Sequence, residues 1–341
     1  MYTKINKNIF GAIDSYNEGV QKQISSSGSA FVIMKDNEII HEWYSGTHHF
    51  EEGARKIDGA SQFNVYSTRV TYVGLALALA VFEGYLNLDD RLCDFFNDLD
   101  SETLGETTIR HLLTRCTGLK INGGKVSRIF NIGTNIEGKR PDLLAKIHEI
   151  STGKTISQVL KERVFQPLNW SQTGWMTEGK STLVCDIHSH IDYPTIRLGS
   201  RSGEDRNLYV SARELAYWGN LHLNKGLVNN KQVLAKEIFE LSTTIQSPSN
   251  LPKKHPKFGF LWWIKDSETS CSYNEMSSEL PEGSFQILGA SNCSCTVLPK
   301  YTTVAVRMYN SLCETPKEHY SYLEDINTYG NLVVSAIKEL H

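Results

Sequence analysis

Long apolar runs and a leader-like segment are both missing from this 341-residue sequence. The amino-terminal stretch MYTKINKNIFGAIDSYNEGV has no run of the roughly 7–15 apolar residues that a secretory signal needs. The longest apolar stretch, VTYVGLALALAVF, falls short of the roughly 18 residues that span a bilayer. We therefore expect a cytoplasmic protein with no membrane partner, in which this stretch forms a buried helix.

A charge excess of either sign is missing as well. The formal net charge is -3 at pH 7, so no basic surplus favours nucleic acid as a partner. The cysteines form an odd set without metal-ligand spacing, which predicts free thiols in a reducing compartment. They are Cys93, Cys116, Cys185, Cys271, Cys293, Cys295 and Cys313. The pairs His48–His49 and His188/His190 lack a third ligand at metal-site spacing, so we expect no metal and no other cofactor.

The order of predicted elements indicates one domain over residues 1–341. A helix over 5–24 precedes a strand hairpin turning at Asp36-Asn37, and a buried helix runs from Ser67 to Gly84. The segment 105–240 is mainly helical; strands return at FGFLWWI, FQILGAS, CSCTVLP and TTVAVRMY, before a terminal helix, TYGNLVVSAIKEL.

Because these strands are split along the chain, they form one antiparallel sheet only if the middle of the chain is an inserted lobe. We predict an α/β (α+β) fold: an antiparallel sheet flanked by amino- and carboxy-terminal helices, plus an all-helical lobe. The α/β lobe takes about residues 1–65 and 250–341, and the helical lobe about 66–249.

Local signals define several helix ends. Thr107 or Thr108 is the expected N-cap of TTIRHLLTR. PDLLAKIHEIS is expected to begin near Pro141 and to end before Gly153. In VSARELAYWGNLHL, Ser211 followed three residues later by Glu214 predicts a capping box.

Five strings, in order, resemble the serine β-lactamase and penicillin-binding-protein family, especially its class C branch with esterases and D-alanyl peptidases. FNVYSTRVTYVGLALALAVFEGYLNLDDRL resembles the segment that carries the nucleophile, and TTIRHLLTRCTGL is very similar to the family's "TIRHLLTHTSGL". VFQPLNWSQTGW, VSARELAYWGNLHL and FGFLWWI resemble "PLGMxxTxW", "SSARDLARFGQLLL" and "YGLGWWV". The resemblance covers residues 28 to 335 approximately and implies the family's two-lobed fold.

The resemblance also implies a reaction. In the family a serine at the start of a buried helix attacks a carbonyl carbon and forms an acyl-enzyme. Lysine in S-x-x-K, a Tyr or Ser in a second motif, and a Lys or His in a third motif handle the protons. Here Ser67 occupies the nucleophile position, but the S-x-x-K lysine is Val70, and Arg69 makes a poor base because it stays protonated.

The second motif is altered too. Aligned forward from Gly133-Thr134, the tyrosine position falls on Gly138 and the asparagine position on Arg140; aligned back from Leu143, they fall on Ile136 and Gly138. Neither alignment gives a Tyr or Ser. Lys139 and Arg140 could bind an acidic group, although solvated loop charges are the simpler interpretation.

In the third motif the family's "GHGG" falls on Gly289, Ala290, Ser291 and Asn292, so that Ala290 replaces the Lys or His. Cys293 then takes the position whose backbone N–H completes the oxyanion hole with the N–H of the nucleophile. Because these donors are backbone groups, the hole can survive the loss of side chains. A small buried strand residue is the simpler interpretation of Cys293 itself.

Other groups are candidates by type. Tyr66, which flanks Ser67, and Tyr209, near the mouth of the implied cleft, could contact a ligand or act as a base. Tyr72 and His148 are further candidate bases, and nothing in the sequence shows which of these reaches the serine.

Two functions therefore remain open, together with a third, narrower idea. The first is a serine hydrolase or acyltransferase that works through Ser67 with an atypical base and is not an efficient β-lactamase. The second is an inactive homologue that keeps the cleft to bind a peptide-like or acyl ligand, or a partner protein. The third is a cytoplasmic role in making or resisting a small natural product. The sequence leaves the oligomeric state open.

Overall fold

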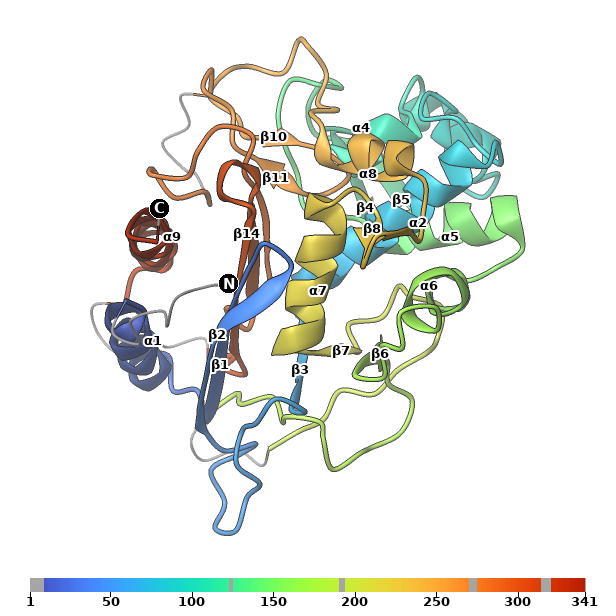
Figure 1. Ribbon diagram of the computed structural model, residues 1–341. Helices are drawn as coiled ribbons and strands as arrows, with labels where there is room; N and C mark the ends of the chain where they lie inside the picture. Colours follow the sequence, from blue (N-terminus) through green and yellow to red (C-terminus); the bar gives the residue numbers. More distant parts are fainter. Residues whose placement is uncertain (1–8, 123–124, 190–193, 270–274, 314–319, 341) are drawn as a thin grey trace.

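A seven-stranded antiparallel sheet forms the centre of the computed structural model, which describes residues 9–122, 125–189, 194–269, 275–313 and 320–340 (Figure 1). Its strand order is β10-β11-β12-β13-β14-β1-β2. The strands are β1 (Gly28–Lys35), β2 (Glu38–Gly46), β10 (Lys257–Phe258), β11 (Trp263–Ile264), β12 (Phe285–Leu288), β13 (Ser294–Leu298) and β14 (Thr303–Tyr309). The predicted pairing of early and late strands in one sheet is confirmed.

Helices cover both faces of this sheet, which is why all eight residues of β1 are buried. Helices α1 (Gly11–Gln23) and α9 (Tyr322–Lys338) lie on one face and α7 (Ala212–Leu223) on the other (Figure 1). Arg307 of β14 and Asp325 of α9 form a fully buried, two-pronged ion pair, with both N···O distances 2.8 Å. On the opposite face, a Cβ at Gly219 of α7 would lie 2.6 Å from Val304. A helix from the middle of the sequence thus also packs on the sheet.

Helix α2 (Val70–Phe82) is the predicted core helix. Its residues from Val70 to Ala80 are all buried, because α5 (Pro141–Thr152), α6 (Ile156–Leu160) and α8 (Lys236–Thr243) surround it. Gly84, with a φ of +77°, ends the helical run as predicted. No helix in the described parts of the chain is both long and apolar enough to cross a membrane.

The middle of the chain is less purely helical than predicted, because short strands accompany its helices. They form a three-stranded sheet, β3-β7-β6, and two hairpins. The strands are β3 (Gln62–Asn64), β4 (Leu119–Asn122), β5 (Lys125–Arg128), β6 (Thr173–Trp175), β7 (Leu208–Ser211), β8 (Leu227–Val228) and β9 (Lys231–Gln232). The remaining helices are α3 (Ser101–Leu104) and α4 (Ile109–Leu113), with 3-10 turns at Tyr66–Arg69, Leu92–Asp94 and Pro299–Tyr301 and a π-helical turn at Lys161–Phe165.

Two local predictions are wrong: the single strand FGFLWWI and the capping box at Ser211. FGFLWWI forms two short strands, β10 and β11, because the chain folds back at Leu261, whose φ is +65°. Ser211 caps α7 by accepting from Glu214 N at 3.2 Å. The Glu214 side chain does not complete a capping box; it accepts instead from Ser171 N and Gln172 N. The beginning of the predicted first helix, residues 5–8, lies outside the described residues.

Candidate active site

The candidate nucleophile Ser67 lies at the amino end of α2. Strand β3 ends at Asn64, whose side-chain oxygen accepts a hydrogen bond from Tyr66 N at 3.1 Å. Tyr66 has a φ of +45°, a left-handed conformation that is rare for a bulky residue. Ser67 is partly exposed between buried neighbours, and no group among the described residues hydrogen-bonds to its Oγ. The chain thus turns sharply and presents this hydroxyl at the helix end.

Arg69 and Val70, where the 3-10 turn passes into α2, do not supply a base in place of the missing lysine. Val70, at the lysine position, is 1% exposed and packs in the main core. Arg69 donates to Tyr66 O at 3.3 Å and to Glu204 O at 2.8 Å. Burial lowers the pKa of Arg69 to about 10. At neutral pH Arg69 therefore still carries its proton.

The hairpin between β12 and β13 lies directly against the turn that carries this serine. A Cβ added at Gly289 would lie 2.4 Å from Val65 O and 3.2 Å from Thr68 Oγ1. Ser291 Oγ donates to Asn64 O at 3.2 Å. Only glycine allows the backbone of the hairpin to approach this closely. The segments expected to carry the first and third motifs are therefore in contact.

Hydrogen-bond alternation leaves the N–H of Leu288, at the end of β12, without a strand partner. Gly289 N donates to Cys293 O at 2.7 Å, so in this antiparallel ladder Gly289 and Ile287 bond to β13 and Leu288 faces the other side. On that side β11 pairs only with the first two residues of β12. The Leu288 N–H has no strand partner in the described structure, and β12 contacts the turn that carries the nucleophile. It is therefore available as a hydrogen-bond donor.

The other residues of the third motif do not contribute side chains to the serine turn. Ala290 is at the exposed hairpin tip, where with Asn292 it borders a separate hollow of about 280 Å³. Asn292 closes the turn with a φ of +61°. Cys293 is fully buried, with Sγ 3.2 Å from Ser291 Oγ, and burial raises the pKa of its thiol to about 11. A buried thiol that holds its proton is not a competent nucleophile.

The loop before α5, where the second motif is expected, carries no hydroxyl in place of the tyrosine. Gly138 is exposed, and a Cβ there would meet nothing within 4 Å. Arg140, considered as a ligand contact, forms an ion pair with Asp142, with Nη2···Oδ2 at 2.8 Å. Glu137 anchors the loop by accepting from Thr117 N at 2.8 Å. The hydrogen bond from Thr117 fixes the loop, and the charge of Arg140 is already paired with that of Asp142.

Lys139 in the same loop places an amine in the electrostatic environment of the serine turn. Its charge interacts with Arg115, Glu275 and Arg69, and Arg69 follows Ser67 by two residues. Burial and the two arginines lower the pKa of the Lys139 amine to about 8. No described group lies within hydrogen-bonding distance of its Nζ. From the sequence this lysine is indicated only as an anion-binding group, because its electrostatic interaction with Arg69 depends on tertiary structure.

The two predicted ligand-binding tyrosines belong to a buried cluster beside the turn. Tyr66 Oη donates to Asp186 Oδ2 at 2.5 Å, and Tyr209 Oη accepts from Arg197 N at 2.9 Å. Both tyrosines are less than 5% exposed. Burial raises the pKa of the Asp186 carboxyl to about 6. The cluster braces the nucleophile turn, and no sequence signal had indicated Asp186.

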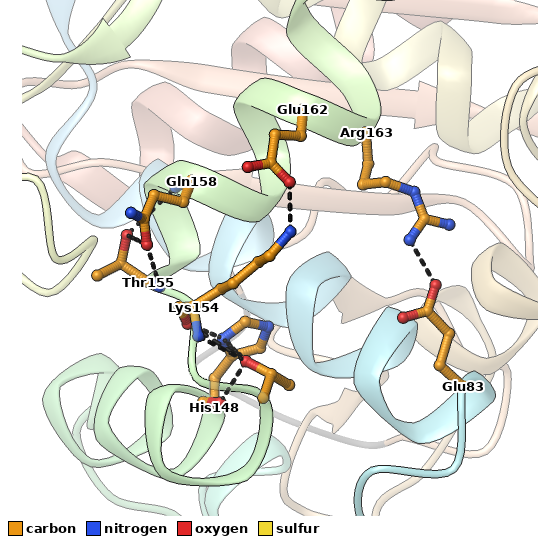
Figure 2. Close-up of polar contacts among 8 residues, drawn as sticks. Glu83, His148, Lys154, Thr155, Gln158, Glu162 and Arg163 are labelled. Atoms are coloured by element: carbon orange, nitrogen blue, oxygen red, sulfur yellow. Dashed lines mark hydrogen bonds and ion pairs between the residues drawn. The ribbon is translucent and has the colours of Figure 1, made fainter.

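Two further candidate bases lie away from the hydroxyl. Tyr72 is fully buried and stacks on Trp218 at 3.8 Å between ring centroids. Figure 2 shows His148 beside Lys154, whose carbonyl oxygen lies 2.9 Å from its Nδ1, and near Glu83. Glu83 follows the last residue of α2, and a helix of that length spans about 20 Å. His148 is therefore at the opposite end of α2 from Ser67.

The remaining histidines and cysteines give no metal centre in the described residues, where no group of three or more His, Cys, Asp or Glu side chains converges. His48 is buried, with Nδ1 3.0 Å from Leu183 O and Nε2 2.9 Å from Ser61 Oγ. The six described cysteines are free thiols. Cys271 and His190 lie outside the described residues.

Comparisons with known proteins agree with the fold. The profile of the β-lactamase family matches residues 13–126 and 141–325. The unmatched stretch between them contains the loop in which the second motif is altered. An uncharacterized protein of Alkalihalophilus pseudofirmus is 37% identical over 338 residues, which cover 98% of this chain and 99% of the relative.

Solved structures share the same architecture. A class C β-lactamase superposes with a TM-score of 0.78 at 12% identity, covering 98% of both chains. A penicillin-binding-protein homologue from Caulobacter crescentus gives 0.74 at 14% identity over 98% of this chain and 99% of its own. EstCE1, a hydrolase with promiscuous acyltransferase activity, gives 0.72 at 17% identity over 95% and 98%. The chain belongs to the β-lactamase family and has the serine-hydrolase fold of its class C members.

Proposed function

We propose that this protein is a serine hydrolase or acyltransferase that forms an acyl-enzyme on Ser67 from a small ester or thioester. The observation that carries the proposal is the contact of Gly289, which follows β12, with Val65 and Thr68 in the turn that carries the partly exposed Ser67. Family membership and the fold shared with EstCE1 support it.

The oxyanion hole in this proposal consists of two backbone donors. One is the Ser67 N–H at the amino end of α2, where the helix dipole favours negative charge. The other is the Leu288 N–H, which takes the place that sequence reasoning gave to Cys293. The carbonyl of Cys293 points toward Gly289, whereas the Leu288 N–H is directed away from β13 and has no strand partner among the described residues.

Lys139 serves as the base. As Ser67 Oγ attacks the carbonyl carbon, the hydroxyl proton passes to the neutral amine of Lys139, which then returns it to the departing alkoxide or thiolate. Water or an acceptor alcohol then attacks the carbonyl carbon of the acyl-enzyme and gives up its proton to the same amine. As the bond from that carbon to Ser67 Oγ breaks, the amine passes the proton to Oγ, which releases the acid or ester product and restores both the Ser67 hydroxyl and the neutral amine. A general base of this kind contributes about 10²–10⁴-fold.

A second candidate function is that of a non-catalytic binder. Two observations favour it: the lysine position is taken by the buried Val70, and no described group hydrogen-bonds to Ser67 Oγ to activate it. It predicts that an acyl or peptide-like ligand raises the melting temperature equally in the wild type and in Ser67→Ala.

Intact-mass spectrometry after treatment with a fluorophosphonate distinguishes the hydrolase from the non-catalytic binder. The hydrolase proposal expects one adduct per chain, absent in Ser67→Ala, and labelling slowed about 10²-fold or more in Lys139→Met. Lys180→Met, a change at an exposed loop lysine, is the control and should label normally. No adduct on the wild type, or the same adduct on Ser67→Ala, would remove the proposal.

A further inference from the structure

A cavity of about 580 Å³ lies beside α7, and no residue of the proposed active site lines it. Four segments form it: the β1–β2 turn, the turn before β6, the outer side of α7, and the β8–β9 hairpin. Its volume is within the roughly 300–1,000 Å³ of small-molecule sites. The segments come from distant parts of the sequence, so the folded chain alone creates the cavity.

Two half-buried aromatic rings form one wall. Trp170 and Tyr217 have ring centroids 6.3 Å apart at an interplanar angle of 31°. Behind them, Trp170 packs on Phe165 at 6.2 Å and on Trp218 at 6.5 Å. The wall is therefore held in place from the core, and its rings offer apolar surface without needing to move.

Asparagine residues at three tight turns also line the cavity. Asn37, Asn169 and Asn229 have φ values of +71°, +56° and +49°. Glycine would suit each backbone conformation, but it would not supply the donor and acceptor of an amide. The side-chain amide of Asn37 is fixed because its Oδ1 accepts from Asn220 Nδ2 at 3.0 Å and from Asn224 Nδ2 at 2.8 Å. This amide is thus positioned in advance of any ligand.

Among the described residues that line the cavity, Lys231, which is exposed, is the one that carries a charge. A ligand that suits both apolar rings and neutral amides has a C–H face and several hydroxyl groups. We propose that this cavity is a saccharide-binding site for one or two pyranose rings, which stack on Tyr217 and Trp170 and hydrogen-bond to the asparagine amides. The site works independently of acylation at Ser67.

Isothermal titration and saturation-transfer NMR on the full chain test this with methyl glucoside, cellobiose, maltose and N,N′-diacetylchitobiose. At least one sugar is expected to bind with a Kd of about 1 mM or tighter. Asn229→Gly, which keeps the left-handed turn and removes one amide, should weaken binding about five- to tenfold. Tyr217→Ala should weaken it at least about tenfold.

The matched control is Asn230→Gly in the same hairpin. Asn230 has a φ of +62° and does not line the cavity, so this change should leave sugar binding unaltered. Ser67→Ala should also bind normally, which separates this proposal from the proposed hydrolase. Absence of binding by every sugar at about 20 mM, binding that survives both Asn229→Gly and Tyr217→Ala, or binding of adenosine in place of a sugar would each overturn the assignment.

Discussion

Replacing Gly289 with alanine tests whether the end of β12 and the serine turn act as one site. The added Cβ would lie 2.4 Å from Val65 O, an atom of the backbone that cannot rotate away. Raising this distance to the 3.4 Å of an ordinary contact requires the hairpin or the turn to move by about 1 Å. A displacement of that size between a nucleophile and its oxyanion donors is expected to cost about 10²-fold in rate.

The assay is the rate of fluorophosphonate labelling, measured beside urea unfolding of the same protein. Overpacking of this kind costs about 1–3 kcal/mol, so Gly289→Ala is expected to remain folded and to label about 10²-fold more slowly. Gly179→Ala is the control, because a Cβ there would meet nothing within 4 Å. Wild-type labelling by a stably folded Gly289→Ala protein would refute the claim that these backbone donors form one site with Ser67.

The remaining predictions concern charge. In the wild type the rate of Ser67 labelling should rise with pH through about 8, the pKa of Lys139, because the neutral amine is the form that accepts a proton. Lys139→Met should lack this rise. The same pH profile in Lys139→Met as in the wild type would exclude Lys139 as the base. With the pKa of Asp186 raised to about 6, the folded state binds more protons than the unfolded state between about pH 4 and 6. The free energy of unfolding should then fall by about 3 kcal/mol as pH rises through this window, and urea titrations of Asp186→Asn should lose this dependence. Asp325→Ala leaves Arg307 buried without a counter-charge and should cost about 3–5 kcal/mol, whereas the double replacement Arg307→Met with Asp325→Leu should cost less; equal losses in urea unfolding would contradict this.

Elements with local signals could be predicted from the sequence. Asp36 and Asn37 take positive φ values, as the hairpin turn requires, and Gly153 ends α5 with a φ of +71°. The break between β10 and β11 could not be predicted, because Leu261 gives no local sign of its positive φ. The side chain of Glu214 was assigned to a capping box, but a distant loop offered it backbone donors instead.

In the candidate site, too, the sequence indicates some residues and only the folded structure indicates the others. Ser67 could be found from its place before an apolar helix and from the family resemblance. Lys139 could not be found as a base, because 70 residues separate it from Arg69 and only the folded chain brings their charges together. The proposed donor Leu288 could not be identified for a related reason. Which N–H of a strand is free depends on hairpin register, and here the bond from Gly289 N to Cys293 O sets that register.

The altered motifs remove side chains that would transfer protons, whereas the proposed oxyanion donors are backbone groups. Proton transfer depends on side chains, and the positions that would carry them hold Val70 and Gly138, neither of which can exchange a proton. Stabilisation of an oxyanion depends on backbone N–H groups, which any residue except proline supplies, provided that the strand can approach the helix end. Gly289 permits that approach. In our proposal the backbone half of the site survives substitutions that remove the side-chain half, and the amine of Lys139, from another loop, takes over proton transfer.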